Sequence, residues 1–240
     1  MTSLLSTTTL LCALAVLVGA CVQGASGIGF ALFAAPLVAL LDPELVPGPM
    51  LVLGGAISLL AALRERHHID YRSAAIAFSG RVPGSLVAGL VIGLMPQSAF
   101  AMMFAFLTLA AIALSLWGPR IRATPFMLAT AGLASGFMGT VTSVGTPPMG
   151  LVMQNMEPPR LRATIGLFLI GGSTVSLVVL GVVGRFGLID LQRSFLLIPP
   201  MFLGFWLSSS IKQHIQPVMI RHIVLTVCAL SALMLLLQHH

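Results

Sequence analysis

The sequence predicts an all-α protein that crosses a membrane several times. Of its 240 residues, 58% are hydrophobic and only 8% are charged, and the mean hydropathy is +1.05. An ordinary soluble domain carries about 25% charged residues, so a water-exposed surface could not absorb this many apolar side chains. Apolar runs recur along the chain at about the 20 residues that a helix needs to span the hydrocarbon of a bilayer.

The first apolar segment, residues 4–41, is too long for a single crossing. It is interrupted by Gln23-Gly24-Ala25-Ser26-Gly27-Ile28-Gly29-Phe30 and then by Pro36. Glycine adopts unwound backbone at low cost, and proline cannot donate a hydrogen bond within a helix. We therefore expect a broken helix or a helical hairpin, whose unwound part must be buried in protein or line a cavity.

Seven further apolar segments follow, separated by polar boundaries. Their ranges are residues 48–63, 73–94 and 98–117 in the first half and 125–153, 163–183, 194–211 and 217–237 in the second. The run at 125–153 is again too long for one crossing and is interrupted between Ser135 and Pro148. The first run lacks a positively charged start and a clear cleavage site, so we interpret it as a membrane segment rather than a signal peptide.

The two halves, residues 1–118 and 119–240, are predicted to be repeats of one four-element unit. Gln23-Gly24-Ala25-Ser26-Gly27 aligns with Ser135-Gly136-Phe137-Met138-Gly139 at an offset of 112, which also places Pro36 on Pro148. Small loop insertions explain why the offset then rises to 120 while the order is kept. The later pairs are Asp42-Pro43 with Glu157-Pro158, Gly54-Gly55 with Gly171-Gly172, and Ile69-Asp70 with Ile189-Asp190.

The nature of the two breaks decides how the halves are oriented. Single crossings give four crossings per half and parallel halves, with the basic residues split seven to four between the two sides. Hairpins give inverted halves and a split of nine to two, which fits the excess of basic residues in cytoplasmic loops better. Only Arg185 and Arg193 then lie opposite the side that holds Arg64, Arg66, Arg72, Arg120, Arg122, Arg160, Arg162, Lys212 and Arg221.

The two breaks are candidates for an anion site. Unwound backbone and the N-termini of half-helices expose N–H groups and the positive end of the helix dipole, which suit an oxyanion. The alternative is that small residues only allow close helix packing, and we favour it for Gly54, Gly55, Gly171 and Gly172. The candidate binding residues are Gln23, Gly24, Ser26, Gly27 and Gly29 in the first break and Ser135, Gly139, Thr140, Thr142, Ser143, Gly145 and Thr146 in the second.

Arg81 is the one charged residue well inside an apolar run, and it joins the candidate binding residues. A charge within the membrane is costly and marks a functional site by default. All six acidic residues lie at segment ends or in loops, so Arg81 is left to bind backbone carbonyls, an anionic substrate, or lipid phosphate by snorkelling. The sequence contains no nucleophile–base pair, nucleotide loop or metal cluster, so we expect no enzyme, cofactor or metal.

The paired motifs point to one family. Gly24-Ala25-Ser26-Gly27-Ile28-Gly29-Phe30 with Pro36 is matched by Gly132-Leu133-Ala134-Ser135-Gly136 and Gly145-Thr146-Pro147-Pro148, and Val82-Pro83-Gly84 follows in the first half. Together they resemble the duplicated signature of the TauE/SafE sulfite exporter family over nearly the whole chain. After Gly139 the chain departs from the expected glycines and reads Thr140-Val141-Thr142-Ser143-Val144-Gly145. The resemblance implies a bacterial inner-membrane permease for sulfite, sulfonates or related small organic anions.

These observations predict a multi-pass secondary transporter for a small anion, working by alternating access between two repeats. The resemblance makes sulfite, a sulfonate or a related organosulfur oxyanion the expected substrate. Two alternatives stay open: a non-transporting membrane scaffold or assembly subunit, and a cation-linked carboxylate transporter. The expected partners are the anion and the lipid bilayer; the sequence leaves a homodimer open, and nucleic acid is not expected.

Overall fold

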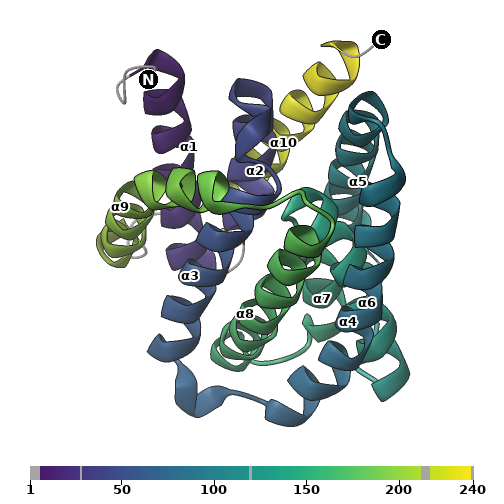
Figure 1. The fold of residues 1–240 in the computed structure, drawn as a ribbon. Helices are drawn as coiled ribbons and strands as arrows, with labels where there is room; N and C mark the ends of the chain where they lie inside the picture. Colours follow the sequence, from purple (N-terminus) through teal and green to yellow (C-terminus); the bar gives the residue numbers. More distant parts are fainter. Residues whose placement is uncertain (1–5, 28, 119–120, 212–216, 239–240) are drawn as a thin grey trace.

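A computed structural model gives the fold (Figure 1) and describes residues 6–27, 29–118, 121–211 and 217–238. Within these residues all regular structure is helical, as predicted, with ten α-helices and two short 3-10 helices. Among the described residues, five helical stretches are long and apolar enough to cross a membrane: Thr7–Ser26, Tyr71–Leu94, Ala99–Leu116, Pro158–Val182 and Leu188–Ser208. The prediction of an all-α polytopic membrane protein is therefore confirmed.

The first long segment is broken near the predicted place. Helix α1 (Thr7–Ser26) ends at Gly27, where φ is +83°, and α2 (Phe30–Leu41) begins after Gly29, where φ is +130°. Both values lie in the left-handed region that favours glycine, which is why the helix stops here. The break is shorter than predicted, because Gln23 and the residues up to Ser26 still belong to α1.

Helices α1 and α2 pack against each other as an antiparallel hairpin. A Cβ added at Gly19 would lie 3.1 Å from the Cβ of Ala34, and one added at Gly29 would lie 3.1 Å from Cγ1 of Val22. The Gln23 side chain closes the turn, because its Oε1 accepts the backbone N–H of Phe30 at 3.0 Å. The chain thus reverses direction at the break instead of continuing across the bundle.

The second long segment is broken in the same way. Helix α6 (Pro125–Thr142) ends at Ser143, where φ is +65°, and α7 (Thr146–Met153) starts after Gly145. The Ser135 hydroxyl donates to the carbonyl of Gly145, so α7 folds back along α6. This break is shorter than the interruption predicted between Ser135 and Pro148, because the residues up to Thr142 still belong to α6.

Each broken segment contributes two helices, so the four predicted elements of a half become five helices in the described residues. The first hairpin is followed by η1 (Pro43–Leu45), α3 (Gly48–Arg64), η2 (Arg66–His68), α4 (Tyr71–Leu94) and α5 (Gln97–Trp117). The second hairpin is followed by α8 (Pro158–Val182), α9 (Leu188–Ile211) and α10 (Pro217–Gln238).

Helix contacts follow the same pattern when the two halves are exchanged. The largest interface joins α4 to α6, and its counterpart joins α9 to α1. In the same way the α4–α8 interface matches α3–α9, and α2–α10 matches α5–α7. The α3–α8 and α5–α10 interfaces each join two helices that hold the same position in the two halves. Much of the core therefore lies between the halves rather than within either one.

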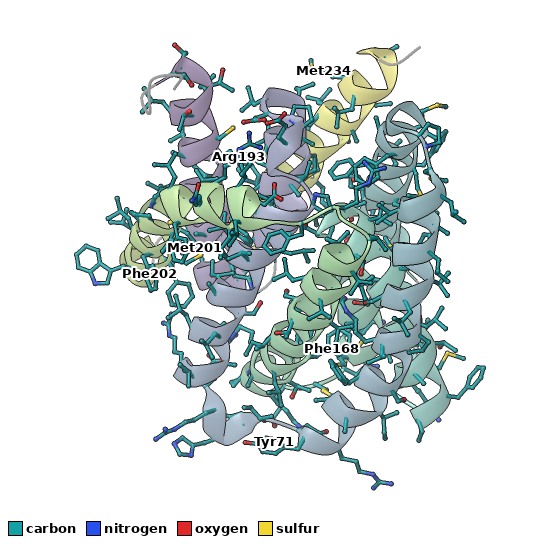
Figure 2. The ribbon with its side chains drawn as sticks, viewed as in Figure 1. Tyr71, Phe168, Arg193, Met201, Phe202 and Met234 are labelled. Atoms are coloured by element: carbon teal, nitrogen blue, oxygen red, sulfur yellow. The ribbon has the colours of Figure 1, made fainter. Side chains whose placement is uncertain are left out.

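The bundle has two ends of different charge. We call the end that holds the start of α4 the basic end; Tyr71 marks it in Figure 2, whereas Arg193 lies toward the other end. Two ion pairs tie α8 to the basic end, Arg160 to Asp70 and Arg162 to Glu65. Described arginines of the basic end are Arg64, Arg66, Arg72, Arg122, Arg160 and Arg162; Arg120, Lys212 and the side chain of Arg221 lie outside what the structure describes.

Candidate functional site

A small cavity lies where the two breaks meet. Its volume is about 20 Å³, which is room for about one water molecule. Phe30, Leu51, Ile57 and Leu169 form an apolar wall. Its polar side is formed by Gln23 from the first hairpin, Ser143, Gly145 and Thr146 from the second, and Ser58, Arg81 and Ser173 from α3, α4 and α8. We call this the central cavity.

Arg81 lies inside the bundle and does not snorkel toward either end. Only 1% of its surface is exposed, and its Nη1 donates to the carbonyl of Ser135 at 2.6 Å and to the Ser135 hydroxyl at 2.8 Å. Nη2 makes a longer contact of 3.4 Å with the hydroxyl of Ser176, and the guanidinium lies 5.5 Å from the ring centre of Phe168. Figure 2 shows Phe168 within the bundle, on α8. The Arg81 cation is therefore stabilised by the carbonyl and hydroxyl dipoles of Ser135 and Ser176 and by the aromatic ring of Phe168.

The charge of Arg81 has no counterion among the described residues. The ion pairs of these residues all lie at the ends of the bundle, and the Nε–H of Arg81 is a buried donor without a hydrogen-bond partner. A buried cation with an unused donor is costly unless something else neutralises it. Because the arginine also lines the central cavity, an anion in that cavity would supply the missing negative charge.

Three glycines make room for the guanidinium. A Cβ added at Gly139 would lie 2.8 Å from Nη1, one at Gly145 2.5 Å from Nη1, and one at Gly172 2.5 Å from Nε. Any side chain at these positions would therefore displace Arg81. Gly172 was expected to serve helix packing alone, but it borders the arginine instead, while Gly171 packs on Phe78 as expected.

Two helices start at the central cavity. Phe30 is the first residue of α2, and Thr146 is the first residue of α7, and both line the cavity. The N-terminus of a helix carries partial positive charge and free N–H groups, so both helices favour an anion at this point. The two hairpins thus direct the same kind of helix end toward one place, beside Arg81.

The structure separates the predicted binding residues into four groups. Gln23, Arg81, Ser143, Gly145 and Thr146 line the central cavity, and Ser135 and Gly139 contact Arg81 from outside it. Gly24 and Gly27 border a different, smaller cavity nearer the basic end. The structure does not bring the remaining four to either cavity: Ser26, Thr140 and Thr142 donate to carbonyls of their own helices, and Gly29 faces Val22.

Sequence reasoning missed the serines of α3 and α8. Ser58 and Ser173 line the central cavity, and Ser176 contacts Arg81 and the hydroxyl of Thr140 at 2.8 Å. Hydroxyls next to the glycine pairs of these helices were the available signal. Gly54 was also assigned to packing, yet a Cβ there would meet nothing within 4 Å, and Gly54 lines the cavity.

A larger cavity of about 470 Å³ opens toward the end opposite the basic one. Charged and aromatic side chains line it, among them Glu44, Arg185, Phe100 and Phe104. Pro47 also lines it, and the carbonyl of Pro47 accepts the Ser143 hydroxyl of the central cavity at 2.9 Å. The hydrogen bond between Ser143 and Pro47 therefore lies between the central cavity and the larger cavity.

Comparison with known proteins assigns the family. No curated protein and no solved structure matches the chain. The family model described as Sulfite exporter TauE/SafE matches residues 11–235, nearly the whole sequence, and this confirms the resemblance inferred from the paired motifs. That family consists of membrane transporters for sulfur anions such as sulfite, and the chain belongs to the TauE/SafE sulfite exporter family.

Proposed function

We propose that this protein is a secondary transporter that binds a small sulfur oxyanion, sulfite or a sulfonate, at Arg81 in the central cavity. The observation that carries the proposal is the buried Arg81 with its unused Nε–H, beside a cavity that both hairpins line. The half-helix N-termini of α2 and α7 and the hydroxyls of Ser143, Thr146 and Ser173 supply further attraction and donors for the anion's oxygens.

The small volume of the central cavity indicates a closed form. About 20 Å³ holds a water molecule, so a sulfur oxyanion requires the helices to separate first. Toward the opposite end, the Ser143 hydroxyl of the central cavity donates to the carbonyl of Pro47, which lines the space of about 470 Å³. An anion would enter from that side when the second hairpin moves away from Pro47.

Alternating access between inverted repeats is supported by the arrangement of the helices. The interfaces keep their pattern when the halves are exchanged, with α4 and α9 in equal places. Tyr71 of α4 and Arg193 of α9 lie toward opposite ends of the bundle (Figure 2). Transporters built this way bind substrate where the repeats meet, near broken helices. We further propose that the basic end faces the cytoplasm of a bacterium and that the protein lies in its inner membrane.

The central cavity offers no group for a buried proton relay. None of the described residues that line it is acidic, so a coupled proton would travel on the substrate itself or through a group at the end of the bundle. Uniport is equally compatible with this lining. The same lack of carboxylates leaves no acidic ligand for a coupled cation, which counts against the cation-linked carboxylate transporter. The scaffold alternative does not explain why Arg81 is buried without a counterion among the described residues.

Uptake of ³⁵S-labelled sulfite into proteoliposomes tests the proposal. Arg81→Gln removes the charge, and Arg81→Lys keeps the charge but loses the planar fork, so we expect both to reduce uptake. A charge-assisted hydrogen bond contributes about 1.5–3 kcal/mol, which corresponds to a loss of roughly 10- to 100-fold. Arg72→Gln, an exposed arginine in the first turn of the same helix, is the matched control and should leave uptake unchanged.

Equal uptake by wild-type and Arg81 variants would show that the site is elsewhere. Because Arg81 joins α4, α6 and α8, its variants must also be checked for folding by their melting temperature without ligand. The wild type should gain melting temperature in sulfite by mass action, and folded Arg81→Gln should not. Uptake that requires sodium and prefers carboxylates would favour the cation-linked alternative instead.

A further inference from the structure

The first break borders a second cavity, which lies between the central cavity and the basic end. Its volume is about 10 Å³, and Gln23 lines both cavities. Gly24 and Gly27, which sequence reasoning assigned to the substrate, line this second cavity rather than the central one. Its other polar side chains are Arg64, Glu65 and Arg162. An anion that leaves Arg81 toward the basic end would pass Gln23 and reach two arginines.

Arg162 binds Glu65 in the geometry that a guanidinium uses for an oxyanion. Its Nε lies 3.1 Å from Oε1 and 2.9 Å from Oε2 of Glu65, and its Nη2 also donates to Oε1. Both side chains are only 18% exposed, so the pair is shielded from water at the end of the bundle. A sulfite or sulfonate group would also present two oxygens to this edge of the guanidinium, as the Glu65 carboxylate does.

The break itself provides the space for Arg162. A Cβ added at Gly27 would lie 1.8 Å from Cδ of Arg162, and the φ of +83° at Gly27 disfavours any side chain there. The stem of the arginine therefore lies directly on the backbone of the break. Gly27 serves two purposes at once, because it ends α1 and admits Arg162 to the second cavity.

We propose that Arg162 is a second anion-binding site on the transport path, which the Glu65 carboxylate occupies in this closed form. This inference rests on the proposed function, since the anion that binds at Arg162 is the one released by Arg81. Opening the basic end would separate Glu65 on α3's C-terminal cap from Arg162 on α8 and free the guanidinium for the substrate. Glu65 thus acts as a built-in competitor that prevents the anion from remaining at Arg162 when the end closes.

Equilibrium binding of ³⁵S-labelled sulfite to the purified full-length protein, in a chloride-free gluconate buffer, tests the inference. We expect the wild type to bind one sulfite per chain, at Arg81. Glu65→Ala removes the competing carboxylate and should bind two. Adding Arg162→Ala to Glu65→Ala should return the number to one. Arg160→Ala breaks the neighbouring ion pair, which does not line the cavity, and should also bind one.

The possible failures can be told apart. If the wild type binds sulfite but Glu65→Ala binds no more, the second site is excluded and the role of Arg81 stands. If neither protein binds sulfite, the proposed function and the second site both fail. Should Glu65→Ala not fold, Glu65→Gln keeps the size of the side chain without its charge. That variant should still bind a second, weaker sulfite that Arg162→Ala abolishes, and one sulfite per chain would overturn the inference.

Discussion

At the scale of single residues, Arg81 shows how far a sequence can lead toward a site. An arginine within an apolar run is visible at once, and its functional interpretation follows from the cost of charge in a membrane. Its partners were not predictable, because Ser135 and Ser176 lie 54 and 95 positions further along the chain. Only the packing of α4 against α6 and α8 brings those hydroxyls to the guanidinium.

Asp70 is a second residue whose role depends on the fold. It caps α4, accepts from the backbone N–H of Ser73 at 3.1 Å and from its hydroxyl at 2.8 Å, and pairs with Arg160 at 2.7 Å. Partial burial opposes ionisation of Asp70, but the hydrogen bonds from Ser73 and the charge of Arg160 outweigh it and lower the pKa of the carboxyl below its usual value. The ionised carboxylate therefore stabilises the folded state.

This lowered pKa predicts a pH-dependent effect of Asp70→Asn. The stabilisation by a carboxylate of lowered pKa is fully present above the unfolded pKa of about 3.9 and is lost as the pH falls through the folded pKa. Because Arg160 is half exposed, we expect the variant to be less stable at pH 7 by about 1 kcal/mol or less. Thermal unfolding of the detergent-solubilised proteins between pH 7 and pH 3 measures the difference, which should shrink on the acid side. A constant difference would contradict the assignment.

At the scale of helices, the largest interface joins α4 to α6, and their backbones meet directly there. A Cβ added at Gly80 would lie 1.9 Å from the carbonyl oxygen of Ala129, and one added at Gly132 would lie 1.9 Å from that of Ala77. Such backbone-to-backbone contact requires glycine on both helices, and it is typical of helix pairs in membranes. The interface holds α4, and with it Arg81, in place against the second hairpin.

Alanine at the tightly packed Gly80 and alanine at the open Gly54 should have opposite effects on stability and on anion binding. Gly80→Ala forces a methyl group into the backbone of α6 and should reduce stability by about 1–3 kcal/mol. Gly54→Ala meets no atom within 4 Å, so it should fold normally, but its methyl group enters the central cavity and should weaken sulfite binding. Melting temperature and ³⁵S-sulfite binding together separate the two effects. Normal binding by a folded Gly54→Ala would show that the anion does not use this side of the cavity.

The sequence located both helix breaks but misjudged their length. Gly27 and Gly29 need the positive φ that glycine allows, so the first break was evident from residue type. In the second, Ser143 adopts a φ of +65° without being glycine, and its hydroxyl is held by Pro47 from a distant part of the chain. Since tertiary contacts stabilise that turn, sequence patterns could not separate it from the helical residues before it.

At the scale of the whole molecule, the charge of the two ends predicts the orientation. Helix α1 begins, and α10 ends, at the end opposite the basic one (Figure 1). With the basic end in the cytoplasm, alkaline phosphatase fused after residue 240 would reach the periplasm and be active, whereas a fluorescent protein there would stay dark. A phosphatase fusion after residue 117, at the end of α5, should be inactive. The reverse pattern would invert the proposed topology.

The duplication of the chain remains a prediction at this scale. Motif order suggested two repeats, residues 1–118 and 119–240, and the exchangeable helix contacts support them. What the sequence could not reveal is that each half packs mainly on the other. Hydropathy marks where helices lie along the chain, but it does not say which helices meet, because every segment is apolar on all sides.

The shared core has a consequence for biosynthesis. When α4 leaves the ribosome and enters the membrane, the α6 backbone and the Ser176 hydroxyl that will hold Arg81 have not yet been made. Until then the helix carries an uncompensated charge, which costs about 2.5–3.5 kcal/mol on scales of translocon insertion. Insertion of α4 before the second half is synthesised therefore includes this cost, and an early stop in translation would leave it uncompensated.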